Sequence, residues 1–502
     1  MIATTFSRLG RTALALSCAA ALVAVGVPTA AQAASPAPSQ TATAAAVTAK
    51  PIVEPTPVLG WSSWSFLRLG VNANNISAEA RAMANSPLRA AGYRYINMDD
   101  NWYQCPGQDG SEGPNVDANG RWLVNNTLFP SQGGVNGIQV LANYIHSLGL
   151  KFGIYETPGI SEQAVARNTP VLGTDFTANE ITNGKPANNY NCGGMLGLNF
   201  TSAGSQDYID STVSQLASWG VDYVKLDGIT NKDTATITAW QTAIQRTHRP
   251  IVLNITQGSY TIKIASTLRQ SANQWEFAPD IETSGPDEGS ANACNVAPFT
   301  GCPDVFPLTN YAQWSDRFDA VAQWQPVGGP NGFNDYDSIE VGNGVADSGM
   351  SVAAEQSQLS LWALGSAPLI LGGDLSNSIT NDYGTHAGLT SSDLAMLTNR
   401  SVLAVDQDGI DASRVVNDGV AQVFTKREQN GADIVGLFNT GMNTSAAPTT
   451  ITISAAQLGL GHQRSIVTDL WTGRQFLLAP GASLSRSVVP EGVSFLKVTP
   501  LN

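Results

Sequence analysis

The sequence predicts an α/β protein, a (β/α)8 TIM barrel followed by a C-terminal antiparallel β-sandwich domain. Three observations support this fold class: eight apolar β-type segments alternate with helical segments, the pattern changes to short strands near residue 402, and 502 residues suffice for two domains. We place a signal peptide at residues 1–33, a linker rich in Ala, Thr and Pro at 34–55, the barrel at 56–401 and the sandwich at 402–502.

The predicted barrel strands are short apolar segments that end in glycine or polar residues. They lie at residues 58–64, 93–100, 151–157, 222–228, 251–256, 274–280, 332–341 and 368–374. Helical segments lie at residues 78–91, 135–149, 206–220, 311–324 and 353–366. Eight strands with intervening helices favour a closed barrel over an open doubly wound sheet. No GxGxxG motif follows the first strand, which argues against a dinucleotide site.

The last hundred residues carry a different pattern. Short β-type runs such as VAQVFTKRE and ADIVGLFN are separated by Gly, Asn and Pro, which is typical of a small antiparallel sandwich. For this domain we favour a structural cap on the barrel over a sugar-binding module.

The N-terminus has the layout of a signal peptide. Arg8 and Arg11 precede an apolar run from Ala13 to Val27, and Ala31-Gln32-Ala33 forms a small-residue cleavage site. The apolar run is short for a membrane anchor, so we expect a secreted protein without a membrane partner.

Four cysteines follow this segment, Cys105, Cys192, Cys294 and Cys302. An even number in an oxidising compartment predicts two disulfides, and the short separation of Cys294 and Cys302 favours pairing them and leaves Cys105 with Cys192. Four free thiols are the alternative. Metal binding by these residues is disfavoured because no CxxC or His-rich spacing accompanies them.

The composition excludes several classes of protein. With 42% hydrophobic and 13% charged residues the chain is globular rather than disordered. A formal charge of -14 argues against nucleic acid as a partner, because phosphate backbones require a basic surface.

Catalytic groups of a parallel barrel lie at the C-terminal ends of its strands. In the segment VDYVKLDG, the period-two rule places Tyr223, Lys225 and Asp227 on one face, with Asp227 at the strand end. We expect Lys225 to keep the Asp227 carboxylate ionised, as a nucleophile requires. A structural ion pair is the alternative interpretation.

A second strand ends in the acids Asp99 and Asp100, followed by Trp102. Carboxylates that accept hydrogen bonds from hydroxyls, beside a ring that stacks on an apolar sugar face, are typical of carbohydrate recognition. Calcium binding is the competing interpretation, but no Asp-rich loop spacing supports it. Trp64 near the first strand and Tyr155 on the third extend the aromatic lining.

The sixth strand approaches its end with Glu276 and then Asp280, which brings a second acid to the rim. If Asp227 and Asp280 face each other about 5 Å apart, the pair suits a retaining double displacement, with Asp280 as general acid and then base.

Taken together, these residues resemble glycoside hydrolase family 27, the family of α-galactosidases and α-N-acetylgalactosaminidases. The resemblance covers nearly the whole chain after the signal peptide. Its motifs are Leu59-Gly60-Trp61-Ser62-Ser63-Trp64, Gly92-Tyr93, Asp99-Asp100, Gly153-Ile154-Tyr155, Tyr223-Val224-Lys225-Leu226-Asp227-Gly228, Pro279-Asp280-Ile281, Asn334-Asp335-Tyr336-Asp337 and Asp469-Leu470-Trp471.

The resemblance implies a retaining exo-enzyme that removes terminal α-D-galactosyl residues and uses no metal or cofactor. It implies these roles: nucleophile, Asp227; acid/base, Asp280; ligands of the sugar hydroxyls, Asp99, Asp100 and Lys225; pocket walls, Trp64 and Tyr155. The Asn-Asp-Tyr-Asp run is expected to brace the seventh strand.

One departure from the family concerns the substrate. Glu276 stands where the family usually has an arginine, so an anion replaces a cation near the 2-hydroxyl of the sugar. We expect Glu276 to raise the pKa of Asp280. The departure keeps alternatives open, namely a β-L-arabinopyranosidase, an isomalto-type α-glucosidase, or a sugar-binding protein without catalysis. The last is less favoured because both aspartates are present.

Overall fold

The computed structural model describes residues 53–105, 115–187, 194–256, 262–282, 307–376, 380–381, 384–385, 388–461 and 463–501. Across these residues, the helices are all too short or too polar to span a bilayer.

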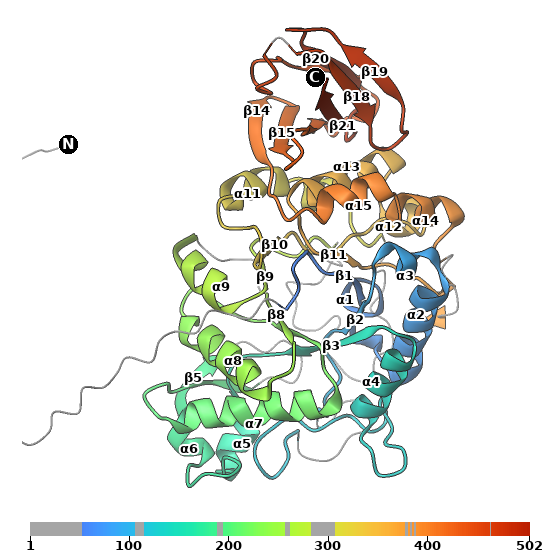
Figure 1. Ribbon diagram of the computed structural model, residues 1–502. Coiled ribbons are helices and arrows are strands. Elements are labelled where there is room, and N and C mark those ends of the chain that lie inside the picture. The colour runs from blue at the N-terminus through green and yellow to red at the C-terminus, as the bar shows by residue number, and fades with distance from the viewer. Residues whose placement is uncertain are drawn as a thin grey trace, which may run out of the picture. The chain divides into compact units, whose positions relative to one another are not determined.

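Eight parallel strands form the barrel (Figure 1), and they are β1 (Leu59–Ser62), β2 (Tyr95–Met98), β3 (Lys151–Glu156), β7 (Tyr223–Leu226), β8 (Val252–Ile255), β9 (Gln274–Glu276), β10 (Phe333–Asp335) and β11 (Leu369–Leu371). From β1 to β10 each of these strands pairs with the next, and β1 also pairs with β11. A parallel bridge between Ile339 and Leu371 closes the ring. The predicted (β/α)8 barrel is confirmed.

The interior of the barrel changes from apolar to polar along the strands. At the N-terminal end, five buried side chains pack together, namely Val58, Tyr95, Tyr223, Val252 and Ile370. Because side chains alternate across a strand, the next inward positions of β7 and β8 are Lys225 and Asn254, which are paired in register. The polar groups therefore gather at the C-terminal end, where barrel enzymes carry their sites.

The main helices between barrel strands are α2 (Ala73–Asn85), α3 (Pro87–Ala91), α4 (Gly137–Ser147), α7 (Gly204–Trp219), α8 (Thr234–Thr247), α9 (Ala265–Ser271), α11 (Arg317–Trp324) and α13 (Val352–Leu364). The segment predicted as one helix at 78–91 is two helices, because Pro87 lacks the N–H that would continue the ladder and begins α3 instead. The segment at 311–324 is likewise divided into α10 (Tyr311–Trp314) and α11. Gly220 ends α7 as predicted, with a φ of 91°.

Shorter elements complete the barrel domain. They are α1 (Trp64–Leu67), η1 (Arg68–Gly70), β4 (Ile160–Ser161), α5 (Glu162–Arg167), α6 (Ala178–Ile181), β5 (Thr182–Ala187), β6 (Met195–Leu198), η2 (Ile262–Ile264), α12 (Val345–Ser348), β12 (Thr380–Asn381), β13 (Gly384–Thr385), α14 (Ser391–Leu397) and α15 (Arg400–Asp406). Helix α15 crosses residue 402, where the sequence places the domain boundary, and the antiparallel strands begin at Ser413.

The C-terminal domain consists of β14 (Ser413–Asp418), β15 (Ala421–Arg427), β16 (Asp433–Asn439), β17 (Thr449–Ile453), β18 (Ser465–Asp469), β19 (Gln475–Leu478), β20 (Leu484–Val488) and β21 (Val493–Pro500). Six strands form one antiparallel sheet, and β17 and β20 form a second. Strand β16 is buried on both faces. Val435 and Leu437 join the core of this domain, whereas Ile434 and Phe438 join the barrel core. The sheet thus packs against the barrel through alternate residues of one strand.

The seventh barrel strand is shorter than the predicted range 332–341. Strand β10 ends at Asp335, and Asp337 has a φ of 79°, a left-handed conformation that interrupts an extended strand. Pairing resumes at Ile339. The interruption turns the Asp337 side chain toward the C-terminal end of the barrel, where it accepts a hydrogen bond from the Ile281 N–H (2.8 Å).

Candidate active site

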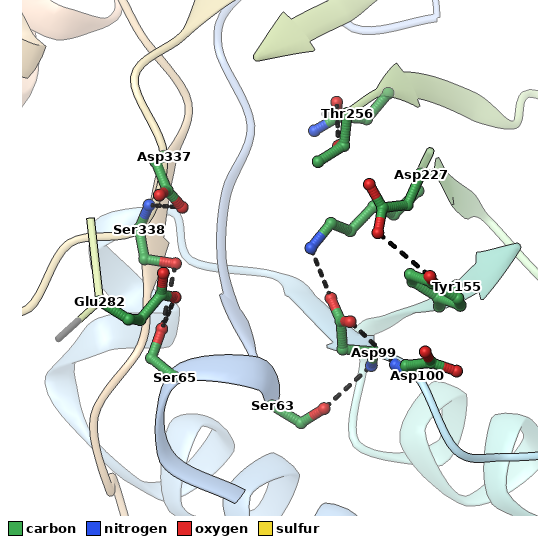
Figure 2. Close-up of polar contacts among 12 residues, drawn as sticks. Ser63, Ser65, Asp99, Asp100, Tyr155, Asp227, Thr256, Glu282, Asp337 and Ser338 are labelled. Atoms are coloured by element: carbon green, nitrogen blue, oxygen red, sulfur yellow. Dashed lines mark hydrogen bonds and ion pairs between the residues drawn. The ribbon is translucent and has the colours of Figure 1, made fainter. Parts of the chain in front are cut away.

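Two groups of polar side chains lie at the C-terminal end of the barrel, on either side of the view in Figure 2. One group comes from strands β2, β3 and β7 and their following residues, and the other comes from α1 and from the loops after β9 and β10. The first contains Asp99, Asp100, Tyr155 and Asp227, and the second contains Ser65, Glu282, Asp337 and Ser338.

Asp227 follows directly on strand β7 and is half-buried. Its Oδ2 accepts a hydrogen bond from the Tyr155 hydroxyl (3.1 Å), and its Oδ1 accepts one from the Gly228 N–H (2.7 Å). Gly228 has a φ of 77°, which a glycine adopts without strain. These donors fix the orientation of the carboxylate.

Lys225 lies at the inward position before Asp227, and its Nζ donates to Asp99 Oδ2 at 2.7 Å. The Asp99 N–H donates in turn to the Ser63 hydroxyl (2.9 Å). Burial alone would lower the pKa of Lys225, but Asp99 and Asp227 raise it well above its ordinary value. Lys225 is therefore a fixed cation held between two acids.

The electrostatic effect of Lys225 on Asp227 differs from the prediction. Burial raises the pKa of Asp227 to about 6, and Lys225 lowers it only in part. Because Lys225 forms its ion pair with Asp99, its charge is shared between the two carboxylates. Lys225 therefore acts on Asp227 in the expected direction, favouring the ionised carboxylate, but burial outweighs this effect.

Asp100 is fully buried beside this pair. It accepts hydrogen bonds from the Tyr103 hydroxyl and from the Asn101 N–H (2.7 Å). Burial, opposed by the Tyr103 hydrogen bond, raises the pKa of Asp100 to about 7. Trp102 donates its indole N–H to the Tyr155 carbonyl (2.8 Å), so the predicted aromatic residue packs behind the acids.

Asp280 lies in the loop after β9, four positions beyond the strand's last residue, Glu276. Although the Asp280 residue as a whole is open to solvent, the protein around its carboxyl group and the charge of Glu282 raise its pKa to about 7. Asp227 raises it further, and Lys225 lowers it. The pKa of Asp280 is raised as expected, but after burial the main cause is Glu282 and not Glu276, to which the prediction assigned the effect.

Glu276, Asp280 and Asp337 form a cluster that we call the acid cluster. One carboxylate oxygen from each lies within 4.8 Å of the other two. Glu276 is 4% exposed, and its Oε1 accepts no hydrogen bond from any residue that the structure describes. Burial, followed by Asp337 and Asp280, raises the pKa of Glu276 well above its ordinary value. This spacing of oxygens could hold a cation.

Arg317 joins the two loops that carry the acid cluster. The guanidinium group is fully buried, and it donates to the Pro279 carbonyl of one loop and to the Tyr336 carbonyl (3.1 Å) of the other. Its Nη2 also lies 3.9 Å from Asp337 Oδ2. Arg317 therefore fixes the positions of Asp280 and Asp337 relative to each other.

The predicted aromatic residues have different environments. Trp64 is half-buried, with the Arg68 guanidinium 5.0 Å from its ring centroid. Tyr155 is buried, and its hydroxyl contacts Asp227. Trp61 is fully buried and donates its indole N–H to the Gly373 carbonyl (2.8 Å), so it belongs to the core.

The Asn-Asp-Tyr-Asp run has two functions. Asn334 accepts a hydrogen bond from the Trp275 indole (2.8 Å) and donates to the Trp324 carbonyl (3.1 Å), which is the expected bracing of the seventh strand. Asp337, by contrast, joins the acid cluster. Of the cysteines, Cys105 is buried, whereas Cys192, Cys294 and Cys302 lie outside the described residues, so their pairing stays a prediction.

Three residues of the site were missed from the sequence: Ser65, Glu282 and Arg317. The Ser65 hydroxyl donates to Glu282 Oε1 (2.6 Å), which places Glu282 beside Asp280. The only signal for Glu282 was its position two residues after a predicted acid. Arg317 lies in a helix and carries no signal of its own.

Comparisons with known proteins agree with this arrangement. Residues 56–168, 190–288 and 307–408 match the family model described as alpha galactosidase A, and residues 418–498 match the alpha galactosidase C-terminal beta sandwich domain. The probable alpha-galactosidase of Dictyostelium discoideum is 30% identical over 89% of this chain and 93% of its own length. The alpha-galactosidase of Oryza sativa subsp. japonica is 27% identical over 89% of this chain and 85% of its own length.

Solved structures include two similar enzymes. A GH27 β-L-arabinopyranosidase from Geobacillus stearothermophilus superimposes with a TM-score of 0.75 at 26% identity, covering 89% of this chain and 97% of that chain. Alpha-galactosidase I from Mortierella vinacea superimposes with a TM-score of 0.63 at 25% identity, covering 89% of this chain and 97% of that chain.

Proposed function

Because this chain belongs to glycoside hydrolase family 27 and is an α-galactosidase-type glycoside hydrolase, we propose that it is a secreted exo-enzyme that removes terminal α-D-galactosyl residues with retention of configuration. The observation that carries the mechanism is the electrostatic coupling of Asp227 and Asp280. Each has a raised pKa, about 6 for Asp227 and about 7 for Asp280, and each lies within the field of Lys225. When two acids share one site but differ in pKa, the one with the lower pKa can serve as the ionised nucleophile and the other as the protonated acid.

In the first step, Asp227 is the nucleophile and Asp280 the general acid. An Asp227 oxygen forms a bond to the anomeric carbon while the bond from that carbon to the glycosidic oxygen breaks. The Asp280 proton moves to the departing oxygen, so the aglycone leaves as a neutral alcohol. The higher pKa of Asp280 favours its protonated form at a pH where Asp227 is ionised.

In the second step, Asp280 acts as the base. Its carboxylate takes a proton from a water molecule, the water oxygen bonds to the anomeric carbon, and the bond to Asp227 breaks. Two inversions give net retention. Lys225 lowers the pKa of both acids, which favours the ionised Asp280 that this step requires.

Recognition of the sugar rests on the paired groups opposite the acid cluster. Asp99 and Lys225 offer an acceptor and a donor fixed by their 2.7 Å ion pair, and Asp100 offers a further acceptor. Such pairs bind adjacent hydroxyls of one ring. Trp64 and Tyr155 supply apolar faces beside them.

The experiment that tests the mechanism follows the anomeric protons of the product by NMR during hydrolysis of 4-nitrophenyl α-D-galactoside. We expect the α-anomer to appear first. Asp227→Asn should nearly abolish turnover, while Asp280→Asn should spare the first step on this good leaving group and regain turnover with azide. Initial release of the β-anomer, or equal loss in both variants without rescue, would contradict these assignments.

The same enzyme should be assayed on a panel of nitrophenyl glycosides. We include the β-L-arabinopyranoside, because a similar structure is described as a β-L-arabinopyranosidase, and the α-glucoside as the other alternative. We expect the highest kcat/KM on the α-galactoside. A preference for either of the other glycosides would overturn the proposed substrate, and it would leave the proposed mechanism unchanged.

We propose secretion from the N-terminal segment, whose residues 1–33 have the layout of a signal peptide. Expression of the full chain in a secreting host should give an extracellular protein whose mass corresponds to cleavage after Ala33. Retention of an uncleaved chain inside the cells would contradict the proposal.

A further inference from the structure

The acid cluster brings three carboxyl groups together, and burial and neighbouring charges raise the pKa of each, so a bound cation would favour their ionised forms. Its three carboxylates come from the end of β9 and from the loops after β9 and β10. Lys225 Nζ is bound to Asp99 at 2.7 Å. Arg317 donates to two backbone carbonyls and to Asp316 (2.9 Å), and its Nη2 lies 3.9 Å from Asp337 Oδ2. Asp335, a further acid, also acts on Glu276.

Within the cluster, Glu276 holds the most unusual position. A buried carboxylate oxygen without a hydrogen-bond donor costs free energy unless a ligand supplies one. Asp337 already accepts the N–H groups of Ile281 (2.8 Å) and Ser338 (2.6 Å), whereas Glu276 Oε1 accepts none from the described residues. The cluster therefore contains a buried acceptor whose hydrogen bond no described residue supplies.

We propose that the acid cluster binds an ammonium group, so that the site accepts a terminal galactose unit carrying a free amine on the carbon next to the anomeric carbon. This inference rests on the proposed function, because it takes Asp280 as the acid that reaches the glycosidic oxygen.

The geometry fits a protonated amine. Three acceptors around one tetrahedral nitrogen, at a charge-assisted hydrogen-bond length of about 2.8 Å, stand about 4.6 Å apart. The three cluster oxygens lie within 4.8 Å of one another. An amine on a sugar has three N–H donors when protonated, and three carboxylates satisfy all of them.

The position on the sugar follows from Asp280. A group on the carbon next to the anomeric carbon is close to the glycosidic oxygen, which Asp280 must reach. In this pose, hydroxyls farther round the ring would face Asp99 and Lys225, which form an ion pair. The carboxylates of Glu276 and Asp337, near that of Asp280, are thus placed at the neighbouring carbon.

A metal ion is the less favoured occupant. Calcium takes six to eight oxygen ligands, whereas the cluster offers one oxygen from each of three carboxylates within this spacing. An ammonium needs three acceptors. The cluster also serves a chemical purpose for an amino sugar, because a positive charge beside the anomeric carbon opposes the positive charge that develops there, and adjacent carboxylates offset it.

The experiment measures binding of galactosamine, galactose and N-acetylgalactosamine to the full enzyme by calorimetry near neutral pH. We expect galactosamine to bind at least tenfold more tightly than galactose, which corresponds to one charge-assisted hydrogen bond in place of a neutral one. N-acetylgalactosamine, which lacks the charge, should show no such gain. In Glu276→Gln the advantage of galactosamine should fall at least tenfold.

Glu340→Gln is the matched control, because Glu340 is a buried glutamate whose oxygens have no donor among the described residues and which lies outside the acid cluster. This variant should keep the preference for galactosamine. Equal affinities in the wild type, or a preference that persists in Glu276→Gln, would overturn the inference. Calcium binding without a preference for the amine would also overturn it, in favour of a metal. Failure to hydrolyse any α-galactoside would instead overturn the proposed function, since binding is measured separately.

Discussion

Replacing Tyr155 with phenylalanine tests the electrostatics of the nucleophile. The change removes the hydroxyl that donates to Asp227 Oδ2 at 3.1 Å and keeps the ring. A hydrogen bond to a charged group contributes about 1.5–3 kcal/mol, and one pKa unit corresponds to about 1.4 kcal/mol. Loss of this donor should therefore raise the pKa of Asp227 by at least one unit, from about 6 toward 7.

The direction in which kcat/KM changes with pH follows from the roles of the two acids. Activity requires Asp227 ionised and Asp280 protonated, so kcat/KM falls below the pKa of Asp227 and above that of Asp280. A one-unit rise for Asp227 should reduce the active fraction roughly eightfold near pH 5.5 but only about twofold at the optimum. The acidic limb of the profile should shift upward by about one unit.

The assay is the pH dependence of kcat/KM on 4-nitrophenyl α-galactoside for the wild type and Tyr155→Phe. Tyr208→Phe is the control, because it removes another buried tyrosine hydroxyl, which donates to the Gly120 carbonyl (2.8 Å). That variant should leave the limb in place. A Tyr155→Phe profile that is lowered equally at every pH would refute the reasoning.

Two further predictions concern stability. Lys225→Met leaves the buried Asp99 without its ion-pair partner and should lower the free energy of unfolding by about 3 kcal/mol, measured in urea; an unchanged value would show that water replaces the amine. Burial raises the pKa of Glu340 from 4.5 to about 8, so the protein loses stability as the pH rises from about 4.5 to about 8, because this carboxyl group is ionised in the unfolded chain and still protonated in the folded one. Glu340→Gln should therefore gain about 2–3 kcal/mol relative to the wild type between pH 6 and pH 9, and equal pH dependence of both proteins would contradict this.

Much of the site could be predicted because it depends on local periodicity. Because side chains alternate along a strand, a single segment places Lys225 and Asp227 on one face. The apolar segment that ends before Asp99 marks the rim of the barrel. The eight strands were predicted from a different local signal, short apolar segments that end in glycine or polar residues. The alternation of side chains does not identify which acid pairs with a given cation. Lys225 forms its ion pair with Asp99, and it also acts electrostatically on Asp227.

The remainder depends on loops and on contacts between distant segments. Asp280 lies beyond the end of β9, and its pKa depends on Glu282, which Ser65 orients from 217 positions away in the sequence. Arg317 binds two loops through backbone carbonyls, a contact that no side-chain pattern encodes. The left-handed conformation of Asp337 likewise depends on its tertiary partners, because it is not a glycine.

The most direct measurement of the central claim is covalent trapping of the glycosyl-enzyme. The wild type is incubated with a 2-deoxy-2-fluoro-galactosyl compound that carries a good leaving group, and the peptides are sequenced by mass spectrometry. We predict one adduct per chain, attached to Asp227, which forms at a similar rate and persists longer when Asp280 is replaced, because the first step is spared and the second step loses its base. An adduct on another residue, or steady hydrolysis without any adduct and with release of the inverted sugar, would contradict the two-carboxylate mechanism.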